Sequence, residues 1–372
     1  MKNILIFSNY LPTQGWGGGV IIRSITNNYP KNCKLFWTKH NLKESQVQQT
    51  CNNIELLPFK TNFFRGRGIS DVILKLESFA IVANFNKLIA QHNIDKVWFV
   101  LGASYDNLYT IHQLCANLKV KYHISVHDDP IVEIVNSRKK KASYHFKNLL
   151  LKADSIDVIS TRMQQLYKKL YNVDSIVITR SIPDDFPQND TINPNIKTIL
   201  MGGFGNASEP WPKPLLESCV ELNKKQNYKL LLFDPKHKQH EDSNIIVYDL
   251  MYESEFNEIL KSTTFGYACD DLDENRLHFA QLSLPTKIIT YIGAGIPFVY
   301  HGPKDGTVGD LVSQFETGII VDSNDKNDLV NGFLKLQSNY QFYQNNCHLA
   351  RQTLFSQSQV QKLFFDTFLN NL

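Results

Sequence analysis

The sequence predicts two α/β domains, each built on a mostly parallel β-sheet that helices wrap on both faces. Short apolar runs alternate with longer amphipathic stretches along the 372 residues, which is typical of buried parallel strands joined by helices. The alternation stops once, at a proline-rich segment, and then restarts. A chain of this length also suits two domains of roughly 150–200 residues better than one ordinary core.

The first domain is expected to span residues 1–182. Leu76, Phe79 and Ala83 fall at helical spacing and predict a helix over 71–92. Two further helices each begin with a residue suited to an N-cap. The expected strands are 4–7, 97–101, 122–126, 156–160 and 176–179, and the two further helices are 106–118 and 161–171.

The second domain is expected over 197–354, after a stiff, irregular linker at 183–196 whose window contains three prolines. An amphipathic segment over 355–372 predicts a C-terminal helix that packs back on the first domain. The expected strands of the second domain are 198–201, 228–233, 245–248, 264–268, 296–300 and 318–321, and its helices are 213–225, 253–261, 286–294 and 325–337.

The net charge of +3 is unevenly distributed. Residues 1–185 hold 24 Lys and Arg against 14 Asp and Glu, or +10, which leaves 39 − 24 = 15 against 36 − 14 = 22, or −7, for the remainder. This imbalance predicts that the first half meets an anionic partner, and phosphate-bearing substrates, nucleic acid and anionic lipid all remain open.

Cysteine usage and hydropathy indicate the cellular compartment in which the protein is expected. The six cysteines are scattered with no C-x-x-C pair, so neither a disulfide framework nor a zinc knuckle is supported, and a cytoplasmic location is expected. No apolar run approaches the ~18–20 residues that cross a bilayer. The apolar run at 4–7 is too short for a signal peptide.

A glycine-rich loop over 15–19 follows the first expected strand and precedes a helix. Gly18 and Gly19 allow a backbone to approach a ligand closely, and a helix N-terminus offers N–H groups to an anion. The spacing is not G-x-G-x-x-G, and no acidic residue ends a second strand ~20 residues later, so a dinucleotide site is disfavoured. A simple turn is the alternative.

His127 and Asp128 directly follow the strand expected at 122–126. A His–Asp pair at the carboxyl end of a strand can orient a hydroxyl or exchange a proton. An ordinary polar loop remains the alternative.

The most specific segment of the chain is 284–297. Pro285 or Thr286 can begin a helix whose first N–H groups point at a phosphate, and Lys287 adds a positive charge for the same phosphate. A capped surface helix would explain the two ends of the segment. It would not explain a lysine in the first turn, where the helix dipole disfavours a cation.

This segment resembles the P-x-K-x-x-E-Y-x-A-x-G-x-P signature of GT-B glycosyltransferases, most closely the glycosyltransferase family 4 type. Other pieces match in the expected order, namely the glycine-rich loop, the His-Asp segment at 122–130, the strand at 153–161 and Gly-Ile-Ile-Val at 318–321. The resemblance implies two Rossmann-like domains facing a central cleft. It also implies transfer of a sugar, with retention of configuration, from a nucleotide diphosphate sugar as co-substrate to a hydroxyl, without a cofactor or metal.

The resemblance also assigns residue roles. The second domain would hold the donor, with Pro285, Thr286 and Lys287 at its diphosphate, and Gly18 and Gly19 would approach from the first domain. His127, with Asp128 beside it, would contact the transferred sugar or the acceptor hydroxyl. The acceptor implied is a growing glycan or lipid-linked saccharide of a bacterial surface polysaccharide. The other implied donor-binding residues are Gly203, Met251 and Thr290.

The chain departs from the family pattern at the E-x7-E pair. Leu282 and Thr290 stand where the two carboxylates would be, and Gly203 stands where the family has an arginine. A non-catalytic relative that binds a sugar or a partner transferase is therefore the second hypothesis. A third is a metal-dependent GT-A enzyme, because Asp271 and Asp273 form a D-x-D after an expected strand.

The first half also mixes aromatic and basic residues. Phe63, Phe64, Arg65 and Arg67 lie close together, and Arg138–Lys141 form a second basic cluster. Such mixing fits peripheral contact with an anionic membrane, here the inner face of the cell membrane. Nucleic acid would accept the same side chains, but no nucleic-acid motif accompanies them, so a nucleic-acid partner is not expected. A solvated loop is the alternative.

Overall fold

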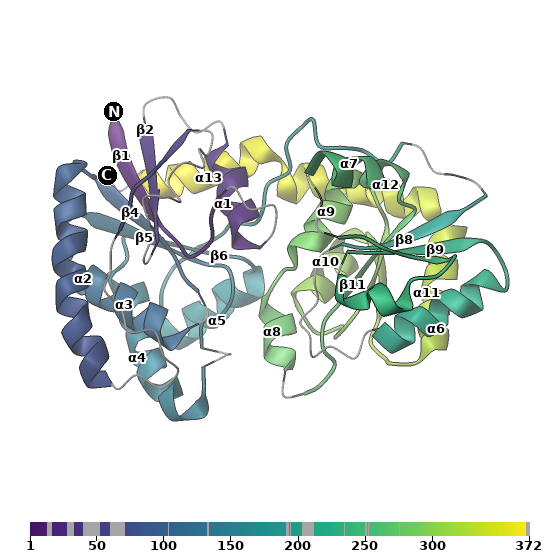
Figure 1. Ribbon diagram of the computed structural model, residues 1–372, viewed down its shortest axis with the longest axis horizontal. Helices are drawn as coiled ribbons and strands as arrows, with labels where there is room; N and C mark the ends of the chain where they lie inside the picture. Colours follow the sequence, from purple (N-terminus) through teal and green to yellow (C-terminus); the bar gives the residue numbers. More distant parts are fainter. Residues whose placement is uncertain are drawn as a thin grey trace. The chain divides into compact units, whose positions relative to one another are not determined.

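In a computed structural model the chain forms two compact units (Figure 1). Unit 1 comprises Met1–Thr179 and Gln361–Leu372, and unit 2 comprises Arg180–Val360. The structure describes residues 1–12, 17–27, 33–39, 53–59, 71–102, 104–131, 134–190, 193, 195–202, 212–233, 235–249, 251, 253–274 and 276–369.

Unit 1 is built on a parallel sheet with the strand order β3-β2-β1-β4-β5-β6-β7 in the described part of the chain. Because β1 lies between β2 and β4, the order reverses at β1, and such a reversal opens a ligand crevice at the carboxyl edge of a parallel sheet. The strands are β1 (Lys2–Phe7), β2 (Cys33–Thr38), β3 (Ile54–Leu56), β4 (Lys96–Val100), β5 (Lys121–Val126), β6 (Ser155–Val158) and β7 (Ile176–Val177).

The helices of unit 1 follow the sequence signals for their ends. Ser104 and Ser160 cap α3 and α5 by accepting hydrogen bonds from the N–H groups of Asn107 and Met163. Asn172 ends α5 in the left-handed conformation, with φ 54°. The helices are α1 (Gly18–Thr26), α2 (Asp71–Gln91), α3 (Tyr105–Ala116), α4 (Asn136–Lys152), α5 (Thr161–Tyr171) and, from Gln361 onward, α13 (Gln357–Leu369).

Three elements of unit 1 were not expected from the sequence. β2 and β3 extend the sheet beyond β1. Only Leu35–Trp37 are consecutive apolar residues in β2, and β3 is three residues long with Glu55 at its centre. The third unexpected element is α4, whose first turns contain the basic cluster Arg138–Lys141. Its cations therefore lie at the N-terminal end of a helix, where the dipole does not favour them.

Helix α2 confirms the expected helix but presents its apolar residues differently. Leu76 and Phe79 are 66% and 67% exposed, although their spacing predicted the helix. The buried face carries Leu74, Ile81 and Phe85 instead. Because α2 has apolar residues on both faces, periodicity alone could not decide which face is buried.

Residues 361–369 of α13 pack on β4 and β5. The ring of Phe364 lies 4.7 Å from that of Trp98, measured between centroids, and both side chains are buried. The Lys96 ammonium group donates a hydrogen bond of 2.6 Å to the carbonyl of Phe368 near the end of the helix. A cation is favourable there because the helix C-terminus carries a partial negative charge.

Unit 2 repeats the design with a parallel sheet of order β10-β9-β8-β11-β12-β13 among the described residues. The order again reverses at the first strand, β8, which lies between β9 and β11. The strands are β8 (Lys197–Met201), β9 (Tyr228–Leu232), β10 (Ile245–Val247), β11 (Phe265–Cys269), β12 (Phe298–His301) and β13 (Gly318–Val321).

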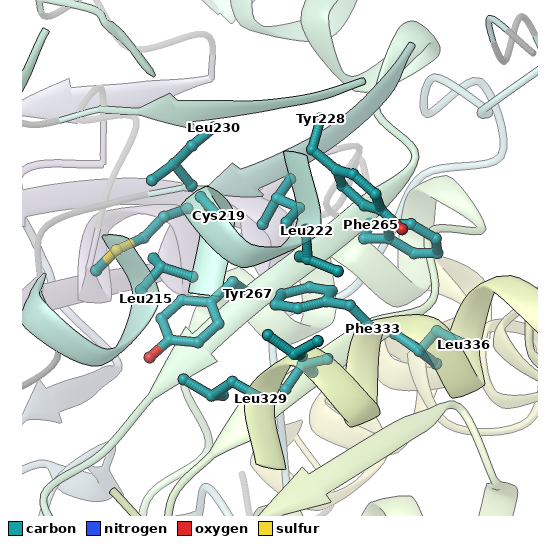
Figure 2. Packing of buried hydrophobic residues seen from close by; sticks show 14 of the residues in the cluster. Leu215, Cys219, Leu222, Tyr228, Leu230, Phe265, Tyr267, Leu329, Phe333 and Leu336 are labelled. Atoms are coloured by element: carbon teal, nitrogen blue, oxygen red, sulfur yellow. The ribbon is translucent and has the colours of Figure 1, made fainter. Parts of the chain in front are cut away.

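One face of this sheet carries a hydrophobic core that α6 and α11 complete. Figure 2 shows Leu222 of α6, Phe265 of β11 and Phe333 of α11 meeting there, each with 0% exposure. The helices of unit 2 are α6 (Pro212–Asn223), α7 (Glu253–Ser262), α8 (Leu277–Leu282), α9 (Thr286–Ala294), α10 (Thr307–Phe315), α11 (Lys326–Ser338) and α12 (Tyr340–Ala350), with a short 3-10 helix at Pro235–His240 and a π-helical turn at Arg351–Phe355.

Candidate functional site

In unit 2 the candidate site is the N-terminal end of α9. The chain runs from β11 through α8 and α9 to β12, a crossover that begins α9 on the side of the carboxyl edge of the sheet. Pro285 is the N-cap residue, and no side chain of the described residues caps this end. Pro285, Thr286 and Lys287 are each half-buried. The first N–H groups of α9 are therefore suited to an anion, and Lys287 lies beside them.

Tyr291 fixes α9 against the sheet. Its hydroxyl accepts a hydrogen bond of 2.9 Å from the N–H of Gly202, and it lies 2.9 Å from the carbonyls of Leu200 and Tyr267. A Cβ at Gly266 would lie 2.5 Å from the Tyr291 ring, so the strand needs glycine there. Burial raises the pKa of Tyr291, so its hydroxyl stays protonated. The start of α9 is thus held near the point where the strand order reverses.

Thr290 lies one turn inside α9 and contacts an arginine that sequence reasoning did not assign to the site. Its Oγ1 donates to the carbonyl of Thr286 at 3.0 Å and accepts from Nη1 of Arg180 at 2.5 Å. The guanidinium carbon of Arg180 also lies 5.5 Å from the centroid of the Phe186 ring. Arg180 precedes the proline-rich segment, and no sequence spacing links it to Thr290. The contact between the two residues could therefore be found only from the folded structure.

The remaining residues predicted for unit 2 are Met251 and Gly203. Met251 is half-buried in the connection between β10 and α7. Gly203 lies outside the described residues.

The D-x-D pair is engaged in a turn. Oδ1 of Asp271 accepts from the N–H of Asp273 at 2.9 Å, and Oδ2 accepts from Arg276 at 3.2 Å. Within the described residues no group of three or more His, Cys, Asp or Glu side chains is arranged to hold a metal ion. The pair is therefore explained by local structure, and the two wound units do not support the GT-A hypothesis.

In unit 1 the predicted residues meet at the carboxyl edge of the sheet through Tyr10. A Cβ at Gly18 would lie 2.6 Å from Cδ2 of Tyr10, so only glycine fits beneath this ring. Tyr10 also stacks on His127, with centroids 6.5 Å apart and an interplanar angle of 27°. Gly19 is buried in the first turn of α1, and Asp128 is half-buried. Sequence reasoning missed Tyr10, which follows β1 within the polar segment before the glycine-rich loop.

His127 is 5% exposed, and neither ring nitrogen has a hydrogen-bond partner among the described residues. Burial lowers the pKa of His127, and the charge of Asp157 opposes this shift only in part. The imidazole is therefore neutral at physiological pH. A neutral imidazole can both accept and donate a proton, which suits acid–base chemistry.

The predicted membrane-contact residues Phe63, Phe64, Arg65 and Arg67 lie outside the described residues. Within the part of the chain that the structure describes, no helix is long and apolar enough to span a membrane.

Comparison with known proteins matches this architecture to solved structures. No family model and no curated protein matches the chain. Sucrose-phosphate synthase from Thermosynechococcus elongatus is similar with a TM-score of 0.75 and 11% identity, over 100% of this chain and 99% of that one. Anabaena HepE in complex with UDP is similar with a TM-score of 0.71 and 12% identity, over 100% of both chains. A glycosyltransferase from Rickettsia africae is similar with a TM-score of 0.69 and 14% identity, over 99% of both chains.

These neighbours are GT-B glycosyltransferases. The chain therefore has the GT-B fold, as its sequence motifs predicted.

Proposed function

We propose that the protein is a glycosyltransferase that moves a sugar from a nucleotide diphosphate sugar to a hydroxyl. The acceptor is a glycan or lipid-linked saccharide in bacterial surface polysaccharide synthesis. The resemblance of its motifs to the family 4 type favours a hexosyl donor, retention of configuration and no requirement for a metal.

The N-terminal end of α9 carries this proposal. At this end no side chain of the described residues caps the helix N–H groups, Lys287 lies in the first turn, and Arg180 contacts Thr290 one turn further along. Helix N-termini and cations together favour a diphosphate. HepE, which shares the fold, was solved with UDP and with UDP-glucose. A uridine diphosphate sugar is therefore the first donor to test.

Two features of the first half of the chain favour an acceptor located at a membrane surface. Ile73, Leu76 and Phe79 form an exposed apolar stripe on α2, and the half of the chain that contains it carries an excess of +10. Apolar side chains and cations on one body favour contact with anionic lipid. We therefore place the enzyme in the cytoplasm at the inner face of the cell membrane.

The second candidate is a non-catalytic GT-B relative that binds a sugar or a partner transferase. One observation favours it. Thr290 stands where the resembling family has a carboxylate, and it is occupied by Arg180 rather than open to a ligand hydroxyl.

Two measurements test the proposal. Thermal-shift titration with UDP, GDP, dTDP and CMP identifies the nucleotide, and release of that nucleotide from its sugar conjugates reports turnover. We expect stabilisation by one nucleotide and turnover that persists in EDTA. Stabilisation without turnover, for every donor and acceptor tried, would support the non-catalytic relative. Turnover lost in EDTA and restored by a divalent cation would contradict metal independence.

A further inference from the structure

A buried polar cluster connects β4, β5 and β6 inside unit 1. Oδ1 of Asp157 accepts hydrogen bonds from Ser125 Oγ at 2.6 Å and from His123 Nε2 at 2.7 Å. Trp98 Nε1 donates to Ser125 Oγ at 2.6 Å, and His123 Nδ1 lies 2.7 Å from Ser155 Oγ. His123, Ser125 and Asp157 are each 0% exposed.

The sheet register places Asp157 between two histidines. Ser125 is the direct partner of Asp157, and His123 is the partner of Ser155. Alternate residues of a strand point to the same face, so His123 and Ser125 share the face on which His127 follows at the end of β5. Asp157 is therefore the diagonal neighbour of both His123 and His127.

One carboxylate oxygen of Asp157 and both ring nitrogens of His127 lack a hydrogen-bond partner in the described part of the chain. Oδ2 of Asp157, and Nδ1 and Nε2 of His127, are buried and have no hydrogen-bond partner among the described residues. The charge of Asp157 acts on His127, where it opposes the lowering of the pKa by burial. Buried polar atoms of native proteins are almost always paired with protein or with an ordered water. A water between Oδ2 and a ring nitrogen would pair both groups.

We propose that Asp157 is the positioning residue of His127, holding one ring nitrogen through a buried water bound to Oδ2. The water accepts from the imidazole N–H and donates to the carboxylate. His127 is thereby kept in one tautomer, with its other ring nitrogen left as an acceptor for a ligand hydroxyl. The catalytic consequence rests on the function proposed above, whereas the contact itself does not.

The other groups around His127 do not replace this contact. Tyr10 lies against the ring face rather than at a ring nitrogen. Oδ1 of Asp129 accepts from the N–H of Ile131 at 2.8 Å. Asp128 precedes it in the same loop and is half-buried. On the far side of Asp157, His123 is paired at both ring nitrogens.

The variant Asp157→Asn tests the proposal because it changes one oxygen selectively. The amide oxygen can still accept from Ser125 and His123, whereas the amide nitrogen at the Oδ2 position can only donate. The intervening water then donates to His127 rather than accepting from it. Ser155→Ala is the matched control, since it removes a bond at the far end of the cluster and leaves Asp157 intact.

The primary readout is the imidazole nitrogen NMR spectrum of the full chain labelled at histidine, with His127→Gln to assign the signals. We expect a single neutral tautomer of His127 in the wild type. In Asp157→Asn we expect the opposite or a mixed tautomer and a pKa lower by about one unit. An unchanged tautomer and titration in Asp157→Asn would overturn the proposal.

If Asp157→Asn does not fold, a crystal structure of the wild type decides instead. An ordered water within about 3.2 Å of both Oδ2 and a ring nitrogen is expected, and its absence overturns the proposal.

Activity separates this inference from the proposed function. We expect Asp157→Asn to lower kcat about 10–100-fold with the donor KM within about threefold, and Ser155→Ala to change neither. A spectral change in Asp157→Asn without a change in kcat would keep the contact and reject its catalytic role. A spectral change in a chain that turns over no donor would keep the contact and reject the proposed function.

Discussion

Arg180 and Thr290 change what a ligand meets one turn inside α9. A carboxylate at this position only accepts hydrogen bonds, whereas a guanidinium only donates them. Here Thr290 accepts from Arg180, and Lys287 lies near the helix start. The N-terminal end of α9 is thus suited to anionic groups rich in hydrogen-bond acceptors, such as phosphates. It is less suited to the sugar hydroxyls that a carboxylate would bind.

Replacing Lys287 tests this anion site. We expect Lys287→Ala to weaken binding of the donor nucleotide by about 1.5–3 kcal/mol, because one charge-assisted contact to phosphate is lost. Isothermal titration with the nucleotide found in the thermal-shift screen measures the change. Lys335→Ala, an exposed lysine of α11, is the control and should bind normally. An unchanged affinity of Lys287→Ala would remove Lys287 from the site.

His112 of α3 provides a prediction of how stability depends on pH. Its Nδ1 lies 3.2 Å from Nδ1 of His145, and burial, followed by the charges of His145 and Lys152, lowers the pKa of His112 to about 4. An unfolded histidine has a pKa of about 6.5, so as the pH falls the unfolded chain binds the proton first. Stability contributed by the neutral ring is therefore present above pH 6.5 and is lost as the pH falls towards 4.

The variant His112→Gln removes the pH-dependent contribution of His112 to stability. We expect the free energy of unfolding in urea to fall less between pH 7 and pH 5 in His112→Gln than in the wild type. Equal losses in the two proteins would show that His112 does not carry the effect.

At the scale of elements, α13 is the cover of β4 and β5. Phe364 is 0% exposed and packs on Trp98, so Phe364→Ala should lower the free energy of unfolding by about 3–5 kcal/mol. Leu363→Ala is the control, because Leu363 lies on the same helix with 46% exposure and should cost far less. Urea denaturation of both variants measures the difference. Equal losses would contradict the assignment of Phe364, rather than Leu363, to the buried face of α13.

Elements whose ends carry strong local signals could be predicted from the sequence. Pro285 begins α9, and Gly295 ends it with φ +70° at a position where a Cβ would lie 2.6 Å from His348. Contacts between distant elements could not be predicted, because Tyr10 with Gly18 and Arg180 with Thr290 depend on how the chain returns to the same sheet edge. The exposed stripe of α2 was missed for another reason, since apolar spacing defines a helix but not the partner of each face.

At the scale of the whole molecule, the charge asymmetry predicts salt-sensitive attachment to membranes. Each basic residue near an anionic surface contributes about 1 kcal/mol, so four to six of them give reversible binding. We expect the protein to sediment with anionic liposomes at low salt, and less at high salt, where screening shortens the reach of each charge. Neutral liposomes should bind it weakly.

The stripe on α2 allows a matched control for this experiment. Phe79→Gln should reduce sedimentation with anionic liposomes, whereas Phe342→Gln, at a 48% exposed phenylalanine of α12 in unit 2, should not. Protein that stays in the supernatant under every condition would indicate a soluble acceptor and another role for the basic half.

The division of unit 1 between two stretches of chain affects its synthesis. The chain leaves unit 1 at Thr179 and returns to it at Gln361, after all of unit 2. At a translation rate of 5–20 residues per second, the surface around Trp98 waits about 10–40 s for the helix that covers it. During that interval unit 2 is being synthesised, and the growing chain exposes an aromatic patch on the ribosome. The segment made first is therefore completed last, and in this interval a chaperone would protect the nascent protein most.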